Sequence, residues 1–209
     1  KDADPNYILD IAKKGKYNAV ILQKGIAEKY NDKIKKLKIP IIIKLNGKTN
    51  LFGGEAVSRQ ICTVKEALKL GAVAVGYTIY IGSKYESVMM KEFDSIEEEA
   101  HKKGIPVIAW VYPRGKGIGK KSEREIMAYA GRIGLEIGAD IIKIKYDGDF
   151  DDLKWTVHVA GKTKVVVAGG TKSDEKMFLK QVQDIMKSGA AGLAVGRNVW
   201  QSKNPVELS

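Results

Sequence analysis

Two lysines inside one apolar stretch could carry chemistry. Lys143 and Lys145 alternate with apolar or aromatic residues across 139–146, and this period of two places both lysines on one face of a β-strand. A buried lysine is costly unless it has a partner or a function. Burial and a neighbouring ammonium both favour the neutral amine. Lys143 is therefore a candidate nucleophile that attacks a ketone and forms an imine, while pairing with a carboxylate remains the alternative, which we favour for Lys44.

Two aromatic residues end another apolar stretch, at 105–112. Trp110 and Tyr112 share one face of this predicted strand. If that face points inward, a phenol that can transfer protons borders the same cavity as Lys143; packing in the core is the alternative. Arg114 follows in the next loop, where it faces either a phosphate or solvent.

Glycines end the last two predicted strands, as Gly169-Gly170 and as Gly196-Arg197. In many β/α barrels the loops after strands seven and eight bind phosphate, because glycines let backbone N–H groups approach the phosphate oxygens. We therefore predict a phosphate site there, with simple turn glycines as the alternative. Segment 115–120 is also rich in glycine but lacks P-loop spacing, so it is interpreted as a mobile active-site loop.

The elements that position these residues repeat along the chain. Helical segments end near a glycine and are followed by short, almost continuously apolar strands, which indicates a parallel sheet buried on both faces. The predicted strands are 17–23, 39–46, 72–78, 105–112, 139–146, 164–170 and 190–196. The glycines at the predicted helix ends are Gly71, Gly104, Gly138, Gly161 and Gly189. Such repeats form either a closed barrel or an open sheet.

The strand count favours an α/β fold of the (β/α)8 TIM-barrel type. Seven strands are one fewer than such a barrel has, and 209 residues are fewer than its usual length of about 250. The sequence opens with a polar segment and a helix at 7–14. We therefore expect that the first strand is missing from this sequence, that some residues after Ser209 are missing too, and that 1–209 form a single domain.

Composition excludes several classes of protein. The net charge is +11 and the pI about 9.5, but the lysines are dispersed, and those between 33 and 38 fit the solvated face of a helix. We therefore predict no nucleic-acid partner. No apolar run is long enough for a membrane helix. One cysteine, Cys62, indicates a reducing cytoplasm. His101 and His158 stand alone, so no metal site is predicted.

Several motifs together resemble the DeoC/FbaB aldolase family, in its archaeal class I fructose-bisphosphate aldolase branch. They cover nearly the whole chain and are specific only in combination. The segments that carry the resemblance are 22–30 (LQKGIAEKY), 44–49 (KLNGKT), 75–80 (VGYTIY), 112–115 (YPRG), 140–143 (DIIK), 146–149 (YDGD) and 196–201 (GRNVWQ).

This resemblance implies a Schiff-base lyase that acts on a phosphorylated sugar. Lys143 would form the imine, Tyr112 would donate and accept protons, and Trp110 would contact the substrate. The C1 phosphate would lie at Gly169, Gly170, Gly196 and Arg197. Because the imine replaces a Lewis acid, no metal or other cofactor is expected. The family also uses an aspartate in an Asp-His-Gly segment of strand one, and this sequence contains no such segment.

Two other enzyme functions remain open. A sibling branch, the 2-amino-3,7-dideoxy-D-threo-hept-6-ulosonate synthases, shares the lysine, the tyrosine and the phosphate loops, but Trp110 and the motif at 44–49 favour the bisphosphate aldolase. A phosphosugar isomerase would need a carboxylate base at a strand end, and Asp147 and Asp149 look like turn residues. The family is usually multimeric, so we expect a homo-oligomer, with Tyr80, Tyr85 and Trp200 as exposed interface candidates.

Overall fold

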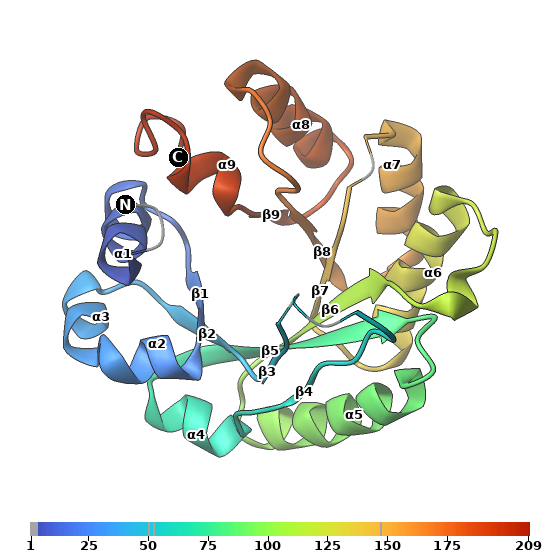
Figure 1. Ribbon diagram of the computed structural model, residues 1–209, viewed down its shortest axis with the longest axis horizontal. Coiled ribbons are helices and arrows are strands. Elements are labelled where there is room, and N and C mark those ends of the chain that lie inside the picture. The colour runs from blue at the N-terminus through green and yellow to red at the C-terminus, as the bar shows by residue number, and fades with distance from the viewer. Residues whose placement is uncertain (1–3, 50, 52, 147) are drawn as a thin grey trace.

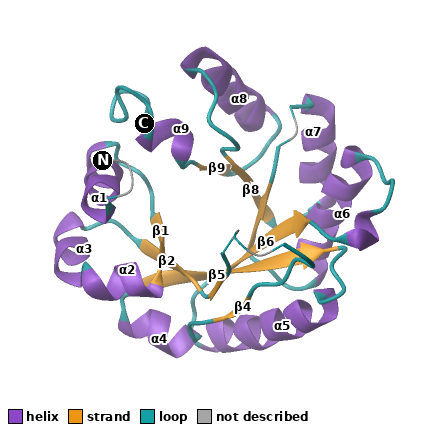
Figure 2. Cartoon of the chain, in the orientation of Figure 1, coloured by secondary structure: helices purple, strands orange, loops and turns teal. Residues whose placement is uncertain are grey.

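A computed structural model describes residues 4–49, 51, 53–146 and 148–209. Its main feature is a parallel sheet of seven strands in the order β1-β2-β5-β6-β7-β8-β9. The sheet is curved and the helices lie around its outer side, as Figures 1 and 2 show. This is an incomplete (β/α)8 barrel, which confirms the predicted fold class.

The strands and helices alternate as the sequence predicts. The seven parallel strands are β1 (Val20–Gln23), β2 (Ile41–Lys44), β5 (Ala72–Ile81), β6 (Val107–Pro113), β7 (Ile141–Ile144), β8 (Lys164–Ala168) and β9 (Gly192–Ala194). The helices are α1 (Pro5–Lys14), α2 (Lys24–Lys29), α3 (Asn31–Leu37), α4 (Val64–Lys69), α5 (Glu86–Lys102), α6 (Glu123–Glu136), α7 (Phe150–Val159), α8 (Glu175–Lys187) and α9 (Arg197–Trp200).

The core lies between the outer face of the sheet and these helices. Tyr77, Ile142 and Ile144 are fully buried there. At Gly134 of α6 an added Cβ would come within 1.9 Å of Ile142 Cγ2, so the glycine lets this helix pack closely on β7. Because one face of each strand is filled by such contacts, the other face lines the inside of the curved sheet.

The five glycines predicted at helix ends all lie just beyond a helix. They have positive φ angles, between 60° and 88°, at Gly71, Gly104, Gly138, Gly161 and Gly189. Glycine reaches this left-handed region without steric strain, and the chain can then turn from the helix into the next strand. The prediction of these five chain reversals is confirmed.

The predicted strand at 39–46 is divided in two. The parallel strand β2 ends at Lys44, and Asn46 belongs to β3 (Asn46–Gly47), which pairs antiparallel with β4 (Arg59–Gln60). Asn46 is fully buried; its Nδ2 donates to Ser58 O and Thr78 O, both at 2.9 Å, and its Oδ1 accepts from Thr78 N. These three hydrogen bonds fix the short hairpin at the end of β2.

Other expectations for single residues have mixed outcomes. Tyr80 is only 8% exposed, so its prediction as an exposed interface residue is wrong: it points into the inside of the sheet with other alternate residues of β5. Tyr85 is exposed and Trp200 is half-buried.

Cys62 is buried, and burial together with the charge of Glu66 raises the pKa of its thiol to about 11. Among the described residues, none of the helices has the length and apolar character needed to cross a membrane.

Candidate active site

Lys143 lies on the inner face of the curved sheet. It is in register with Trp110 of β6 and Val166 of β8, while its neighbours Ile142 and Ile144 are buried on the outer face. The alternation seen in the sequence therefore places this lysine among the strands instead of among the helices, as the proposed chemistry requires.

The amine of Lys143 contacts two aromatic side chains. Its Nζ donates a hydrogen bond to Tyr112 Oη at 2.5 Å, and it lies 5.8 Å from the ring centre of Trp110. No ion pair between Lys143 and a carboxylate is found in the described part of the chain. Burial, and secondly the positive charge of Lys44, lower the pKa of Lys143 to about 8. A substantial fraction of the amine is therefore neutral near physiological pH.

The like charge that lowers the pKa of Lys143 belongs to Lys44, not to Lys145. Lys44 is half-buried at the end of β2, in register with Gln23 of β1 and Gly76 of β5, and burial lowers its pKa as well. Lys145 shares a strand face with Lys143 and is exposed, and its Nζ lies 6.0 Å from the ring centre of Tyr112. The carboxylate partner that we favoured for Lys44 is not found among the described residues.

Tyr112 is positioned to act as an acid. Burial, and secondly the nearby Tyr80, raise the pKa of its phenol well above the usual value, so the hydroxyl keeps its proton at neutral pH. Tyr112 and Trp110 both point inward, and Trp110 is 4% exposed. The structure thus brings together the two aromatic residues and the lysine that the sequence singled out.

The two glycine-rich strand ends lie side by side. Ala168 of β8 pairs with Ala194 of β9, and Gly169 N donates to Ala194 O at 3.0 Å. Gly170 follows with a φ of +69°, which favours glycine. Gly196 precedes α9, where Arg197 is exposed. The four residues predicted to hold a phosphate therefore come from adjacent loops on the same edge of the sheet as Lys143.

A residue of α9 joins these two loops. Asn198 is 4% exposed; its Nδ2 donates to Gly169 O at 2.5 Å and to Thr171 O at 3.1 Å, and its Oδ1 accepts from Ser173 N at 2.8 Å. Asn198 belongs to the motif at 196–201, but the sequence alone predicts no role for it. The available signal was a polar residue two positions after Gly196.

Arg114 directly follows β6, two residues after Tyr112. It is exposed, its guanidinium carbon is 5.7 Å from the ring centre of Tyr80, and its backbone N–H donates to Ile81 O. The guanidinium therefore lies beside Tyr80 and is exposed to solvent.

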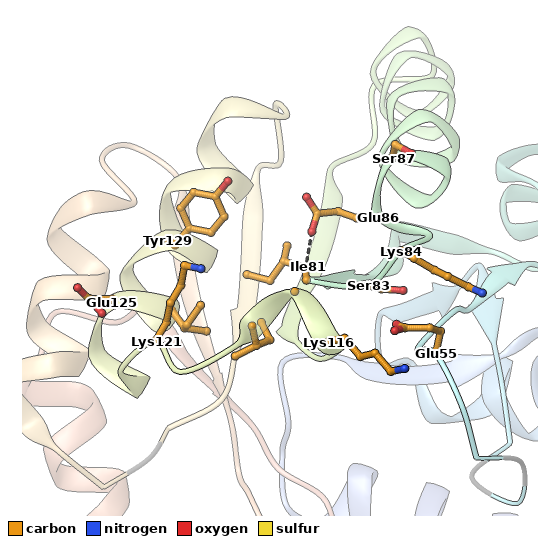
Figure 3. Close-up of a pocket in the computed structure, with 14 residues that line it drawn as sticks. Glu55, Ile81, Ser83, Lys84, Glu86, Ser87, Lys116, Lys121, Glu125 and Tyr129 are labelled. Carbon is orange, nitrogen blue, oxygen red and sulfur yellow. Dashed lines mark hydrogen bonds between the residues drawn. The ribbon is translucent and has the colours of Figure 1, made fainter.

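The glycine-rich segment 115–120 lies beside a different cavity. Its 3-10 turn (Lys116–Ile118) packs on the end of β5, where Gly117 N donates to Gly82 O at 2.8 Å. It lines a cavity of about 990 Å³ together with Lys121 and with residues of α5 and α6 such as Tyr129, and Lys143 is not among the lining residues (Figure 3). The segment therefore borders this cavity, and its role as a mobile active-site loop stays a prediction.

The remaining polar candidates, His101 and Asp149, make contacts with side chains and backbone groups outside the site of Lys143. His101 bridges Glu97 and Asp140 at 2.8 and 2.9 Å on the surface. Among the described residues no group of histidine, cysteine and carboxylate side chains could hold a metal ion. The side chain of Asp149 accepts from Asp152 N and caps α7, as expected of a turn residue, and Asp147 lies outside the described residues.

Known proteins resemble the chain over almost its entire length. A family model described as DeoC/LacD family aldolase matches residues 1–202. A class 1 fructose-bisphosphate aldolase of Thermoproteus tenax is 49% identical over 208 residues, which are 99% of this chain and 78% of that protein.

The chain is also similar to a solved aldolase structure and to an enzyme of a second type. An archaeal fructose-1,6-bisphosphate aldolase, with its catalytic lysine covalently bound to the carbinolamine intermediate of the substrate, has a TM-score of 0.92 and 48% identity, covering 99% of this chain and 81% of that one. A 2-amino-3,7-dideoxy-D-threo-hept-6-ulosonate synthase of Archaeoglobus fulgidus is more distant, with 38% identity over 192 residues, 92% of this chain and 71% of that protein.

Proposed function

The chain belongs to the DeoC/LacD family of aldolases, and from this premise we propose that it cleaves fructose 1,6-bisphosphate reversibly through a Schiff base on Lys143. The products are dihydroxyacetone phosphate and glyceraldehyde 3-phosphate. The observation that carries the assignment to Lys143 is its inward-facing amine, whose pKa is lowered to about 8 and which hydrogen-bonds to Tyr112.

The reaction begins with the neutral amine. Lys143 Nζ attacks C2 of the open-chain ketose and forms a carbinolamine, which loses water to give a protonated imine. The imine withdraws electrons from the bond between C3 and C4. When the C4 hydroxyl loses its proton, this bond breaks and glyceraldehyde 3-phosphate leaves. The remaining enamine takes a proton at C3, and hydrolysis of the imine then releases dihydroxyacetone phosphate and restores the amine.

Tyr112 supplies and removes protons in these steps. Its hydroxyl is 2.5 Å from Lys143 Nζ, within reach of the oxygen that leaves as water and of the substrate hydroxyls. The raised pKa of the phenol suits a group that starts as an acid. Trp110 forms an apolar wall beside the imine.

Phosphate groups fix the ketose in the site. The C1 phosphate lies against Gly169, Gly170, Gly196 and Arg197, where two adjacent loops offer backbone N–H groups and a guanidinium. Arg114, exposed at the end of β6, is the candidate for the second phosphate.

Trapping of the imine tests the proposal. Borohydride reduction in the presence of fructose 1,6-bisphosphate should leave an adduct on Lys143, which mass spectrometry of peptides locates. Lys143→Met should abolish the adduct, and the control Lys145→Met on the same strand face should retain it. A stable adduct on the Lys143→Met variant would exclude this mechanism.

The alternatives predict other outcomes. The heptulosonate synthase would trap its own ketose phosphate in preference to fructose 1,6-bisphosphate, and Trp110 favours the aldolase. An isomerase would convert phosphosugars without any sensitivity to borohydride.

We also propose a cytoplasmic location, supported by the single buried cysteine. We further propose a homo-oligomeric state, which light scattering coupled to size-exclusion chromatography would measure.

A further inference from the structure

The indole of Trp110 occupies space that a side chain on the next strand would fill. If Gly76 of β5 carried a Cβ, that atom would lie 1.6, 2.0 and 2.9 Å from three atoms of the six-membered indole ring. Contacts below 3.0 Å force something to move, and here the obstacle is a rigid ring in a 4% exposed side chain. Gly76 has no positive φ, so space, and not backbone conformation, requires the glycine.

The direction in which a displaced indole would move is limited. Trp110 is in register with Lys143 on its other side, and its ring centre is 5.8 Å from Lys143 Nζ. Pushed away from β5, the ring approaches the amine and the hydroxyl of Tyr112, which is bonded to it. That volume is the one a ketose carbonyl must enter to reach the nitrogen.

We propose that Gly76 is a positioning residue of the active site, which holds the Trp110 indole back from Lys143 and keeps the approach to the amine open for a ketose phosphate. This inference rests on the proposed function. Gly192 of β9 provides a contrast, because an added Cβ there meets no atom within 4 Å. Glycine at position 76 is thus required by this neighbour, and not by the strand as such.

The test measures trapping with two carbonyl compounds of different size. We expect Gly76→Ala to slow borohydride trapping of fructose 1,6-bisphosphate on Lys143 by roughly a hundredfold, as expected for a displacement of about 1 Å at a reacting centre. Reductive methylation of Lys143 by formaldehyde, which needs little space, should change much less. A purely structural defect would affect both reactions alike. Gly192→Ala, the matched control, should trap both compounds at the wild-type rate.

A second substitution makes the cause specific. Phenylalanine lacks the outer ring edge of the indole, so in a Trp110→Phe background the effect of Gly76→Ala on trapping should largely disappear. The inference is overturned if Gly76→Ala alone traps the bisphosphate as fast as the wild type, or if its effect is the same in both backgrounds. If Gly76→Ala does not fold, Trp110→Phe must restore folding, and an unfolded double variant also contradicts the inference. Failure of the wild-type chain to trap any ketose phosphate would instead contradict the proposed function.

Discussion

At the scale of single residues, the reactivity of Lys143 depends on what surrounds it. Burial and a like charge act in the same direction, and both make the ammonium form less stable. The sequence predicted this combination correctly but assigned the like charge to the neighbour on the same strand. The charge comes from Lys44 of β2, three strands away from β7 in the sheet order, and no local pattern reveals that proximity.

The contribution of Lys44 predicts a shift in pH dependence. Imine trapping on Lys143 should rise with pH through a pKa of about 8, since only the neutral amine attacks. Lys44→Met removes the second cause of the lowered pKa, so the pKa should rise and the profile should move to higher pH. Lys145→Met, the control on an exposed lysine, should leave the midpoint where it is. The initial trapping rate between pH 6 and 10 measures both; an unchanged midpoint in Lys44→Met contradicts the electrostatic role.

Removal of the phenol should slow complete turnover without preventing imine formation. We expect Tyr112→Phe to lower kcat by roughly a hundredfold to ten-thousandfold, while an adduct on Lys143 still accumulates with borohydride. Steady-state kinetics and peptide mass spectrometry check the two expectations. Tyr129→Phe, in the separate cavity of Figure 3, serves as the control with unchanged kcat. Normal turnover by Tyr112→Phe would remove this residue from the mechanism.

At the scale of elements, the contacts between loops decide how well the phosphate site is formed. Asn198 joins the loop after β8 to α9 by three hydrogen bonds. Replacing a buried partner leaves backbone groups unsatisfied, at a cost of about 1–3 kcal/mol. Asn198→Ala should therefore raise KM for the bisphosphate by about tenfold or more, whereas trapping of unphosphorylated dihydroxyacetone should be unaffected. Equal losses with both compounds would argue for a general folding defect.

A surface contact between α5 and β7 predicts a dependence of stability on pH. Hydrogen bonding to Asp140 is the largest cause that raises the pKa of His101. Because the pKa of His101 is raised in the folded state, this contact stabilises the fold fully at pH values below the pKa of the unfolded state, about 6.5. The stabilisation is lost as the pH rises through the pKa of the folded state. His101→Gln should flatten this part of the curve of unfolding free energy against pH, measured by urea denaturation. Nuclear magnetic resonance titration of His101 should give a pKa above the ordinary value, and one at or below it contradicts the assignment.

Local patterns predicted the elements better than their ends. The strands follow from apolar runs, and the chain reversals follow from positions where the backbone conformation favours glycine. The break between β2 and β3 was missed because the partners of Asn46 come from residues 58 and 78, far away in the sequence. Gly76 was missed as a site residue for the same reason: its role depends on a ring from the neighbouring strand. Helix α2 lacked a signal because it is short and contains Gly25.

At the scale of the whole molecule, repetition of the β/α unit made the fold predictable. Register then brings Lys143, Tyr112 and the loops after β8 and β9 to one edge of the sheet, although they are far apart in the chain. The sequence pointed to these residues as candidates, but it could not give the distances between them. The cavity beside α5 and α6 was not predicted, because residues from several loops and helices form it.

The net charge of +11 predicts that substrate capture depends on salt. A positive field accelerates the approach of an anionic substrate, and at 0.15 M ionic strength charges are screened beyond about 8 Å. We expect kcat/KM for fructose 1,6-bisphosphate to fall as potassium chloride is raised from 10 to roughly 200 mM, while trapping of dihydroxyacetone stays nearly constant. Stopped-flow measurement of both gives the comparison, and equal salt effects would show that long-range attraction plays no part.

The state of Cys62 makes the whole chain convenient for optical work. Its side chain is buried and its pKa is about 11, so at neutral pH it carries almost no thiolate to react with maleimides. A cysteine introduced at an exposed position such as Lys116 would then be the preferred attachment point for a dye. Single-site fluorophores could follow ligand arrival without first removing the natural thiol.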